Sequence, residues 1–438
     1  MSLLRALLAV FLLSAGVPSV ASPQATPLLR IQGSNTVGAA LAPALVEGLL
    51  RQQGFQDITR QPGALENEQT VRARQAEGPW VRIAIAAHGS STGFRALREG
   101  SAELAASSRP VKDAEVHALA ARGDLRSRAS EQVIAIDGLA VIVHPTNPLR
   151  SLAVDQLAAL FSGELRNWRA LGGPDAPVRL YARDDQSGTY DTFKELVLVP
   201  QGQSLDAGAR RFESNDRLSE AVMADPLGIG FVGLASVGQA RALAISAGGA
   251  QALLPSPDSV ATEDYPLSRR LFLYRAPGDD NPWAQALIDY AQSAEGQRIV
   301  EQVGFIGQAV RVIPVEAHEQ LPGDYRELAQ TARRLSVNFR FQEGSAQLDN
   351  KALRDLERVR DHAGKDAQVV LVGFGDAKSD ASRARLLSRL RAETVRRALS
   401  RLGVTNSQVL GIGDDLPVAS NQAESGRIRN RRVEVWIR

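Results

Sequence analysis

The sequence contains no cysteine among its 438 residues. This absence excludes disulfide bonds, thiolate zinc sites, iron–sulfur clusters, cysteine nucleophiles and any lipid anchor attached through cysteine. Histidine is also scarce, with 5 residues, and no two of them have the spacing that is typical of metal ligands. We therefore expect neither a metal ion nor a cofactor.

A large excess of charge of either sign is absent as well. The chain has 51 Lys and Arg against 49 Asp and Glu, and a net charge of +2 is too small to indicate nucleic-acid binding. The charge is unevenly spread, because residues 335–438 carry a net +6 and the rest of the chain a net −4. A chain of this length forms two or three domains, so we expect domains of different kinds to be joined here.

Long apolar runs are absent except at the beginning of the chain. Arg5, the apolar residues 6–13 and the small residues 19–21 have the pattern of a secretory signal peptide over residues 1–21. The apolar run is far shorter than the roughly 20 residues that a membrane-spanning helix needs. We expect cleavage near Ala21, export to the periplasm and no transmembrane segment in the mature chain.

Residues 28–318 alternate short β-like runs with amphipathic helical runs. Strands are predicted at residues 28–31, 81–86, 139–143 and 178–182, and helices at residues 37–50 and from Phe94 onward. The alternation predicts an α/β sheet with ligands at the carboxyl ends of its strands. About 290 residues are too many for one core, so we expect two lobes with a cleft between them.

A segment with Pro322, Gly323 and many charges follows, and we expect residues 319–334 to be a linker that permits independent motion. Beyond it, residues 335–438 have the pattern of an α+β domain. Strands are predicted at residues 335–341, 368–372, 409–412 and 433–437, and helices at residues 350–363 and in a long run that ends at Leu402. The long helix has one apolar face, which predicts that it packs on a sheet.

Three turns rich in hydroxyl groups occur in the first of these regions: residues 33–36 (Gly-Ser-Asn-Thr), 89–93 (Gly-Ser-Ser-Thr-Gly) and 183–189 (Arg-Asp-Asp-Gln-Ser-Gly-Thr). Each precedes a helical run, where free backbone N–H groups and the positive end of the helix dipole favour anions. Arg183 adds a charged fork that can hold two oxygens. Together the turns suggest a site for a small oxyanion such as phosphate, although each turn alone is typical of a helix cap.

The middle turn also fits the G-x-S-x-G pattern of serine hydrolases, with Ser90 or Ser91 as the nucleophile. Such an enzyme needs a histidine and an acid within reach, and the later histidines lie in no motif. We expect the protein not to be an enzyme, and a hydrolase stays an alternative.

Seven blocks within residues 28–310 resemble the periplasmic phosphate-binding proteins of phosphate ABC transporters, among them QGSNTVGAALAPAL (32–45), DGLAVIVHPTNP (137–148) and RDDQSGTYDTF (183–193). The resemblance implies an α/β two-lobed periplasmic binding protein (type II) that closes on inorganic phosphate or a similar oxyanion. It also implies an ABC permease as a partner. It gives no reason to expect nucleic acid.

Carried over by position, the resemblance implies a phosphate site formed by Ser34, Asn35, Thr36, Ser91, Ser108, Arg183, Asp185, Ser187, Gly188 and Thr189. Asp185 stands where the family uses an acid to orient the arginine. Ser108 stands in a block where many family members have an aspartate that accepts the proton of monohydrogen phosphate. A hydroxyl group accepts hydrogen bonds too, so phosphate binding is still expected.

In the C-terminal region Asp376 follows a predicted strand and Arg391 lies on the next helix. Such a pair can bind the ammonium and the carboxylate of a zwitterion, although an isolated pair is more often solvated surface charge. The blocks VVLVGFGD (369–376), LSRLRAETV (387–395) and GRIRNRRVEVWI (426–437) resemble the OmpA-like peptidoglycan-binding domain. The resemblance implies an α+β β-α-β-α-β-β sandwich that binds peptidoglycan diaminopimelate through Asp376 and Arg391, with Arg431 beside them.

These features predict a periplasmic solute-binding protein that captures inorganic phosphate for ABC-type uptake or sensing. Its C-terminal region is expected to hold it on the cell wall through peptidoglycan. Two alternatives stay open: a wall-anchored structural or adhesion protein that has lost its ligand, and a serine hydrolase that uses Ser90 or Ser91.

Overall fold

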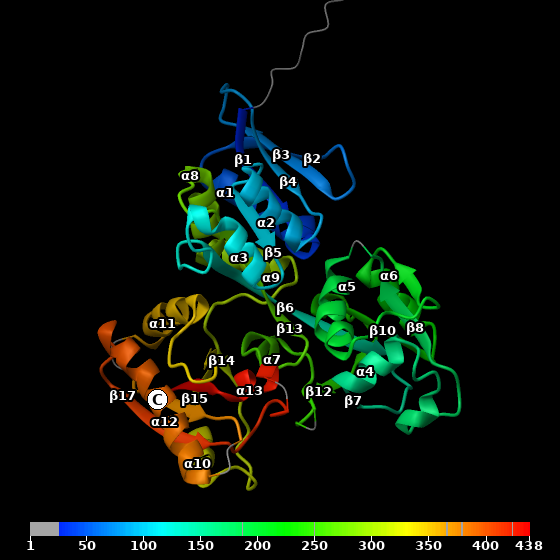
Figure 1. Cartoon of the computed structure of the whole chain (residues 1–438), viewed down its shortest axis with the longest axis vertical. Coiled ribbons are helices and arrows are strands. Elements are labelled where there is room, and N and C mark those ends of the chain that lie inside the picture. The colour runs from blue at the N-terminus through cyan, green and yellow to red at the C-terminus, as the bar shows by residue number, and fades with distance from the viewer. Residues whose placement is uncertain (1–25, 186, 249, 365–366, 378–379, 423) are drawn as a thin grey trace, which may run out of the picture.

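The computed structural model describes residues 26–185, 187–248, 250–364, 367–377, 380–422 and 424–438. The predicted signal peptide, residues 1–21, lies outside the described residues. Figure 1 shows three parts: a first lobe (residues 26–137 in blue and cyan, and 269–309 in yellow-green), a largely green second lobe (138–268) and a tail domain that runs from yellow to red (310–438). Within the described ranges, no helix is both long and apolar enough to cross a membrane.

The first lobe is a sheet with helices on both faces. Its elements are β1 (Thr26–Gly33), α1 (Ala42–Gln52), β2 (Gln56–Pro62), β3 (Glu68–Arg74), β4 (Val81–Ala86), α2 (Ser90–Glu99), β5 (Leu104–Ser107), α3 (Asp113–Leu119), α8 (Pro282–Gln292) and α9 (Ala294–Gln302). Helices α1, α8 and α9 pack on one face, and α2 and α3 pack on the other. The strand at residues 268–275 serves both cores by alternation, since Leu271 and Leu273 face the first and Phe272 and Tyr274 the second.

The second lobe repeats this plan around a smaller sheet. Its elements are β7 (Ser151–Ala153), α4 (Val154–Phe161), β8 (Arg179–Arg183), α5 (Gly188–Phe193), β9 (Arg210–Phe212), α6 (Asn215–Met223), β10 (Gly228–Gly233), β11 (Arg241–Ala242), β12 (Ala244–Ser246) and α7 (Pro257–Ala261). Three fully buried rings, those of Phe161, Phe193 and Phe231, meet at the centre of its larger core. Helix α6 covers the opposite face of the sheet.

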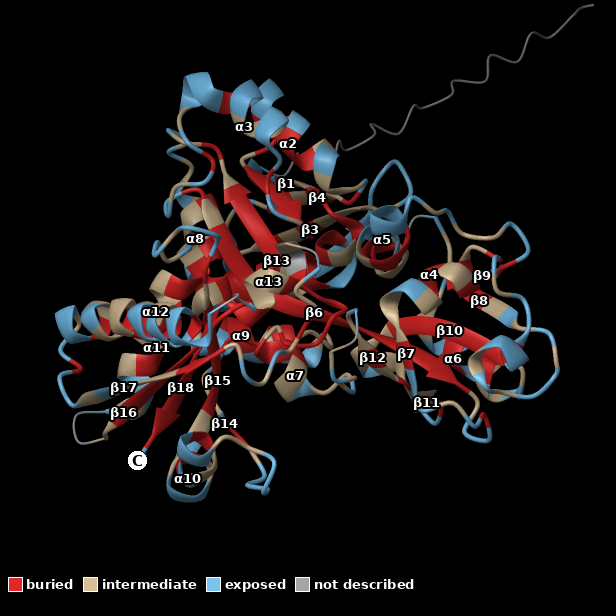
Figure 2. Ribbon diagram, turned by 60° about the horizontal axis from the view of Figure 1, so that its bottom comes forward, coloured by how far each residue is buried: buried red, intermediate tan, exposed pale blue. Residues whose placement is uncertain are grey.

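Two strands cross between the lobes, β6 (Glu131–Val143) and β13 (Ser268–Arg275). They keep one sheet continuous in the order β2-β3-β4-β1-β5-β13-β6-β10-β8-β9. The first half of β6 pairs with β13 and the second half with β10. Strand β6 is buried almost throughout (Figure 2), and Asp137 and Gly138 interrupt its apolar run where it passes between the lobes. The predicted two-lobed α/β fold is confirmed.

The tail domain is a five-stranded sheet in the order β14-β15-β18-β16-β17. Its elements are β14 (Val312–Ile313), α10 (Gly323–Thr331), β15 (Arg333–Arg340), α11 (Asn350–Ala363), β16 (Val369–Phe374), α12 (Ala381–Arg401), β17 (Ser407–Gly413), α13 (Glu424–Asn430) and β18 (Arg432–Ile437). Helices α11 and α12 cover one face of the sheet. The predicted β-α-β-α-β-β order is confirmed for β15 to β18, with β14 and α10 added before it and the short helix α13 added before the last strand.

Helix α10 covers the other face of the tail sheet, in the segment that the sequence predicts to be a linker. Tyr325 and Leu328 are buried against Phe374 and Trp436, and the Tyr325 hydroxyl donates to Glu434 over 2.9 Å. Burial and the Glu434 carboxylate raise the pKa of Tyr325. The segment 319–334 is therefore part of the tail core rather than a free connection.

The lobes touch each other at Gly188 and Thr36. A Cβ atom on Gly188 would lie 1.9 Å from the Thr36 Oγ1 and 2.4 Å from the Thr36 backbone nitrogen. Only glycine permits this approach, because no rotamer change moves a backbone nitrogen aside. The structure is thus a closed arrangement of the two lobes.

Tyr325→Ala is expected to destabilise the tail domain by about 3–5 kcal/mol, because it leaves a cavity under the sheet and removes a buried hydrogen bond. Urea unfolding followed by circular dichroism measures the change, with Glu327→Ala on the exposed side of the same helix as the control. A change below about 0.5 kcal/mol, which is typical of exposed positions, would contradict the packing of α10.

Gly188→Ala is expected to hold the lobes apart, because the added methyl group overlaps Thr36. Small-angle scattering measures the outcome as a larger radius of gyration than that of the wild type. Gly323→Ala is the matched control, since a Cβ atom there meets nothing within 4 Å. Superimposable curves for Gly188→Ala and the control would rule out the closed contact.

Candidate functional site

A cavity of about 270 Å³ lies between the lobes at the carboxyl ends of their strands. Six of the ten residues expected from the sequence line it: Asn35, Thr36, Arg183, Ser187, Gly188 and Thr189. Asp137 and Asn215 line it as well, and sequence reasoning missed both as site residues. The cavity therefore combines both lobes with the strand that crosses between them.

The first turn contributes the start of a helix. Gly33 has a φ of 136°, and a Cβ atom there would lie 2.0 Å from the Ala106 carbonyl oxygen of β5. The Ser34 N–H donates to that same carbonyl over 2.8 Å, which fixes the turn beside β5. The helical run then begins, so Asn35 and Thr36 lie at a helix N-terminus, where the positive end of the helix dipole favours an anion.

The third turn places Arg183 at the end of β8 and begins α5. Ser187 caps α5 by accepting from the Tyr190 N–H over 3.4 Å. The Arg183 guanidinium donates to the carbonyl oxygens of Phe212 and Glu213 over 3.1 and 2.7 Å. Burial lowers the pKa of Arg183, and the Asp184 carboxylate, 3.6 Å away, opposes that shift.

The expectation that Asp185 orients Arg183 is wrong. The Asp185 side chain is 83% exposed, and it accepts from Arg211 over 2.6 Å. The carbonyl oxygens after β9 and the neighbouring Asp184 position Arg183 instead. The sequence alone does not show which of the two adjacent residues, Asp184 or Asp185, faces Arg183.

The two strands that cross between the lobes, β6 and β13, form the hinge. They contribute a buried ion pair between Asp137 on β6 and Arg269 on β13, which are cross-strand partners. The Arg269 guanidinium donates to Asp137 over 3.4 Å, to the Thr36 hydroxyl over 2.7 Å and to the Gly188 carbonyl over 2.7 Å. One arginine at the hinge thus bonds to both lobes. Burial raises the pKa of Asp137 and lowers the pKa of Arg269, because it opposes the charge on both.

The second turn lies outside the lining of the cavity. The Ser91 hydroxyl accepts from Arg109 over 2.9 Å, and Arg109 is also paired with Glu115. The hydroxyls of Ser90 and Ser108 lie 3.3 Å apart. Among the described contacts, neither Ser90 nor Ser91 meets a histidine, so the geometry does not favour a hydrolase.

Four expected residues therefore do not line the cavity: Ser34, Ser91, Ser108 and Asp185. Ser34 is 2% exposed and contributes to the turn through its backbone.

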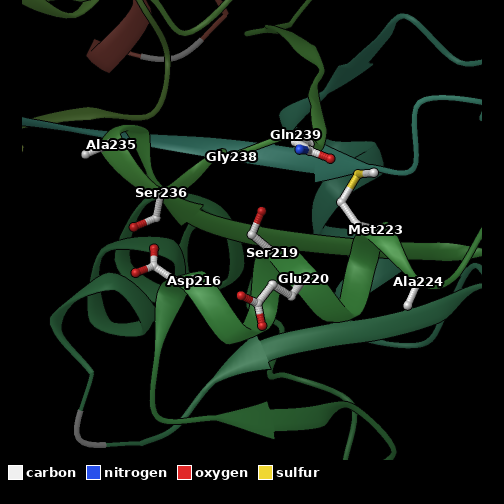
Figure 3. A pocket seen from close by; sticks show the side chains of 9 residues that line it. All are labelled: Asp216, Ser219, Glu220, Met223, Ala224, Ala235, Ser236, Gly238 and Gln239. Carbon is white, nitrogen blue, oxygen red and sulfur yellow. The ribbon is translucent and has the colours of Figure 1, made fainter.

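A larger hollow of about 600 Å³ lies on the second lobe beside α6 (Figure 3). Among the described residues that line it, Asp216 and Glu220 are acidic and none is basic, so it suits an anion poorly.

The cleft can hold a tetrahedral oxyanion. Two helix starts supply N–H donors, Thr36, Ser187 and Thr189 supply hydroxyls, and Arg183 supplies the charge that a buried anion requires. Asp137 can accept a hydrogen bond from a protonated oxygen of the ligand. In the described residues, no group of three or more acidic or histidine side chains is arranged to hold a metal ion.

The tail domain brings its three expected residues together. A Cβ atom on Gly373 would lie 1.9 Å from the Ser388 carbonyl oxygen, so β16 and α12 pack at close range there. Asp376, two residues after the end of β16, and Arg391 on α12 face each other with a closest N–O distance of 4.0 Å. Burial lowers the pKa of Arg391, and Asp376 opposes that shift. Arg431 donates to Asp376 over 3.1 Å, and both side chains are 1% exposed.

Family comparisons agree with both halves of the chain. A family model described as "PBP superfamily domain" matches residues 22–295, and one described as "OmpA family" matches residues 340–431. A structure titled as a possible phosphate binding protein from Planctomyces limnophilus is 23% identical, covers 70% of this chain and 98% of that chain, and has a TM-score of 0.51. That likeness supports the fold.

Two relatives are more similar in sequence. The phosphate-binding protein PstS of Pseudomonas aeruginosa is 30% identical over 306 residues, which cover 64% of this chain and 92% of that protein. Protein SphX of Synechococcus elongatus is 33% identical over 205 residues, which cover 44% of this chain and 59% of that protein. With a family model over more than half of its length, this chain belongs to the PBP superfamily and carries a C-terminal OmpA family domain.

Proposed function

We propose that the cleft binds inorganic phosphate and that the tail domain holds the receptor on peptidoglycan. The observation that carries the first half is the cavity between the lobes, with Arg183 and two helix starts directed at one small space. The name of the Pseudomonas aeruginosa relative, which matches over nearly its full length, supports phosphate as the ligand. Ser187, Gly188 and Thr189 begin the helix that would contact it.

Asp137 gives the proposed site a proton acceptor. Sequence reasoning looked for this group at Ser108, whose hydroxyl is bonded to Ser90. Asp137 is 6% exposed and lines the cavity from the hinge strand, where an acceptor would meet a protonated oxygen of the ligand. A carboxylate disfavours an anion that has no proton to donate, so we infer that the cleft prefers phosphate to sulfate.

The proposed role is that of a receptor and not of a catalyst. We infer that the exported chain works in the periplasm and delivers phosphate to an ABC permease or reports its level. The signal peptide (1–21) and the receptor domain (28–318) remain predictions. We infer that the wall-binding domain includes the predicted linker, residues 319–334, as well as residues 335–438, because Tyr325 and Leu328 of α10 are buried in its core. A wall-anchored protein without a ligand remains the rival, and the calorimetric experiment below separates the two.

For the wall site, the proximity of Asp376, Arg391 and Arg431 supports binding of diaminopimelate. Arg391 is the accessible member, because its side chain is 11% exposed while the other two are 1% exposed. The carboxylate of the diaminopimelate residue would bind Arg391, and the ammonium group of the same residue would bind Asp376.

Titration calorimetry on the full chain is expected to detect phosphate binding that Arg183→Ala weakens by about 3 kcal/mol, or roughly 150-fold, because it removes charge-assisted hydrogen bonds. Arg179→Ala on the same strand is the control, since Arg179 is 59% exposed and paired with Asp225. Wild-type protein that gives no heat with millimolar phosphate would favour the rival without a ligand.

Pull-down with purified sacculi is expected to recover the wild type and not Arg391→Ala, because the arginine fork that receives the peptide carboxylate is lost. Arg401→Ala at the exposed end of the same helix is the control. Thermal unfolding checks that Arg391→Ala still folds, and soluble peptide that contains diaminopimelate is expected to release the wild type. Equal recovery of all three proteins would falsify the wall-binding role.

A further inference from the structure

The tail domain lies against the back of the hinge. On β13, Arg269 bonds toward the cleft, and the next residue, Arg270, faces the opposite side of the sheet. Arg270 donates to Glu263 of the second lobe over 2.5 Å and to Asp349 of the tail domain over 2.7 Å. One side chain on a hinge strand thus joins the second lobe to the tail domain.

Helix α11 of the tail domain holds the first lobe. Arg354 donates to the Gln132 side chain over 2.7 Å, and Arg358 donates to those of Gln292 and Gln308 over 2.5 and 3.1 Å. Asn350, at the start of the helix, donates to Glu131 and to the Arg126 carbonyl over 3.1 and 2.8 Å. These bonds reach β6, helix α8 and the loop that precedes β6.

Strand β15 of the tail domain holds the second lobe. Arg340 donates to Asp264 and to the Thr262 carbonyl over 2.8 and 2.7 Å. Arg334 and Asn338 donate to Asp264 as well, over 3.2 and 3.1 Å. With the tail domain in place the Asp264 side chain is 8% exposed, so docking surrounds this carboxylate with two arginines and shields the ion pairs from water.

Glu263, the residue before Asp264, is also held at the contact between the second lobe and the tail domain. Its φ of 58° lies in the left-handed region, which is unfavourable for a residue with a side chain. Burial opposes its charge, but Arg270, Lys351 and Arg340 outweigh burial and lower the pKa of Glu263 to about 2. Two of these three cations, Lys351 and Arg340, belong to the tail domain.

The two sets of contacts come from one rigid body. Leu335, Val337 and Phe339 of β15 share a core with Leu356 and Val359 of α11. The lobes therefore cannot separate about β6 and β13 unless one set of tail contacts breaks. We propose that the tail domain is a working part of the receptor: docked on both lobes, it stabilises the closed cleft and so strengthens anion binding and slows release.

The affinity claim rests on the proposed phosphate function, whereas the effect on lobe closure does not. Docking lowers the free energy of the closed state before the ligand arrives, so less of the binding energy is consumed in closing the cleft. By linkage, phosphate in the cleft strengthens tail docking by the same factor.

The test uses the full chain with Arg354→Ala and Arg358→Ala combined. Both arginines lie on α11 and reach the first lobe, and neither lines the cleft. Arg360→Ala on the same helix is the matched control, because its ion pair is with the adjacent Asp361. The double variant is expected to raise the phosphate Kd and the dissociation rate about tenfold, and the control is expected to leave both unchanged.

Lobe separation is measured without phosphate by spin labels on Gln53→Cys and Gln201→Cys, exposed positions on the first and second lobes. These labels are specific because the chain has no other cysteine. The double variant is expected to shift the distance distribution toward longer separations. If calorimetry detects no phosphate binding, the proposed function fails while this measurement still tests the tail contacts.

Unchanged distances together with an unchanged dissociation rate would overturn the proposal. A double variant that binds phosphate more tightly would also overturn it, because the tail domain would then favour the open state. If the double variant does not fold, Arg354→Ala alone is expected to show the same changes at smaller size, and a single variant that matches the control overturns the proposal.

Discussion

The bond network of Arg269 is the interaction on which the closed receptor depends. This guanidinium lies where two strands cross between the lobes, and it bonds to a carboxylate of the hinge, a hydroxyl of one lobe and a carbonyl of the other. A buried charge is costly unless it is paired and hydrogen-bonded, so these three bonds favour the arrangement in which both lobes are in place. Asp137, Thr36 and Gly188, the three residues that Arg269 bonds, all line the anion cleft.

The opposite face of the same strand extends this dependence to the tail domain. Neighbouring residues of a strand face opposite ways, so Arg269 and Arg270 connect the ligand cleft and the tail through a single peptide unit. A wall-binding domain on a flexible linker would only fix the receptor in place. One that is docked on the hinge also changes the energy difference between open and closed lobes.

The fold could be predicted from the sequence because the hydrophobic patterns of its helices and strands are regular. The helix at residues 350–363 and the strand at residues 81–86 were predicted to the residue, and six cavity residues followed from motifs. Helix α10 was missed because only Tyr325 and Leu328 mark its buried face among many charges. Asp137 was missed because the predicted strand begins at residue 139, whereas β6 begins at Glu131. Its partner Arg269 stands next to Arg270, and only the register of β13 shows which of the two arginines faces the cleft.

The two crossing strands also decide when the first lobe can be completed. Strand β5, at residues 104–107, pairs with β13, at residues 268–275, and the whole second lobe lies between them in the chain. Contacts so distant in sequence form slowly, because a long loop must close before they stabilise anything. While the chain folds, β5 keeps an unpaired edge until β13 joins it, and that edge is exposed to aggregation.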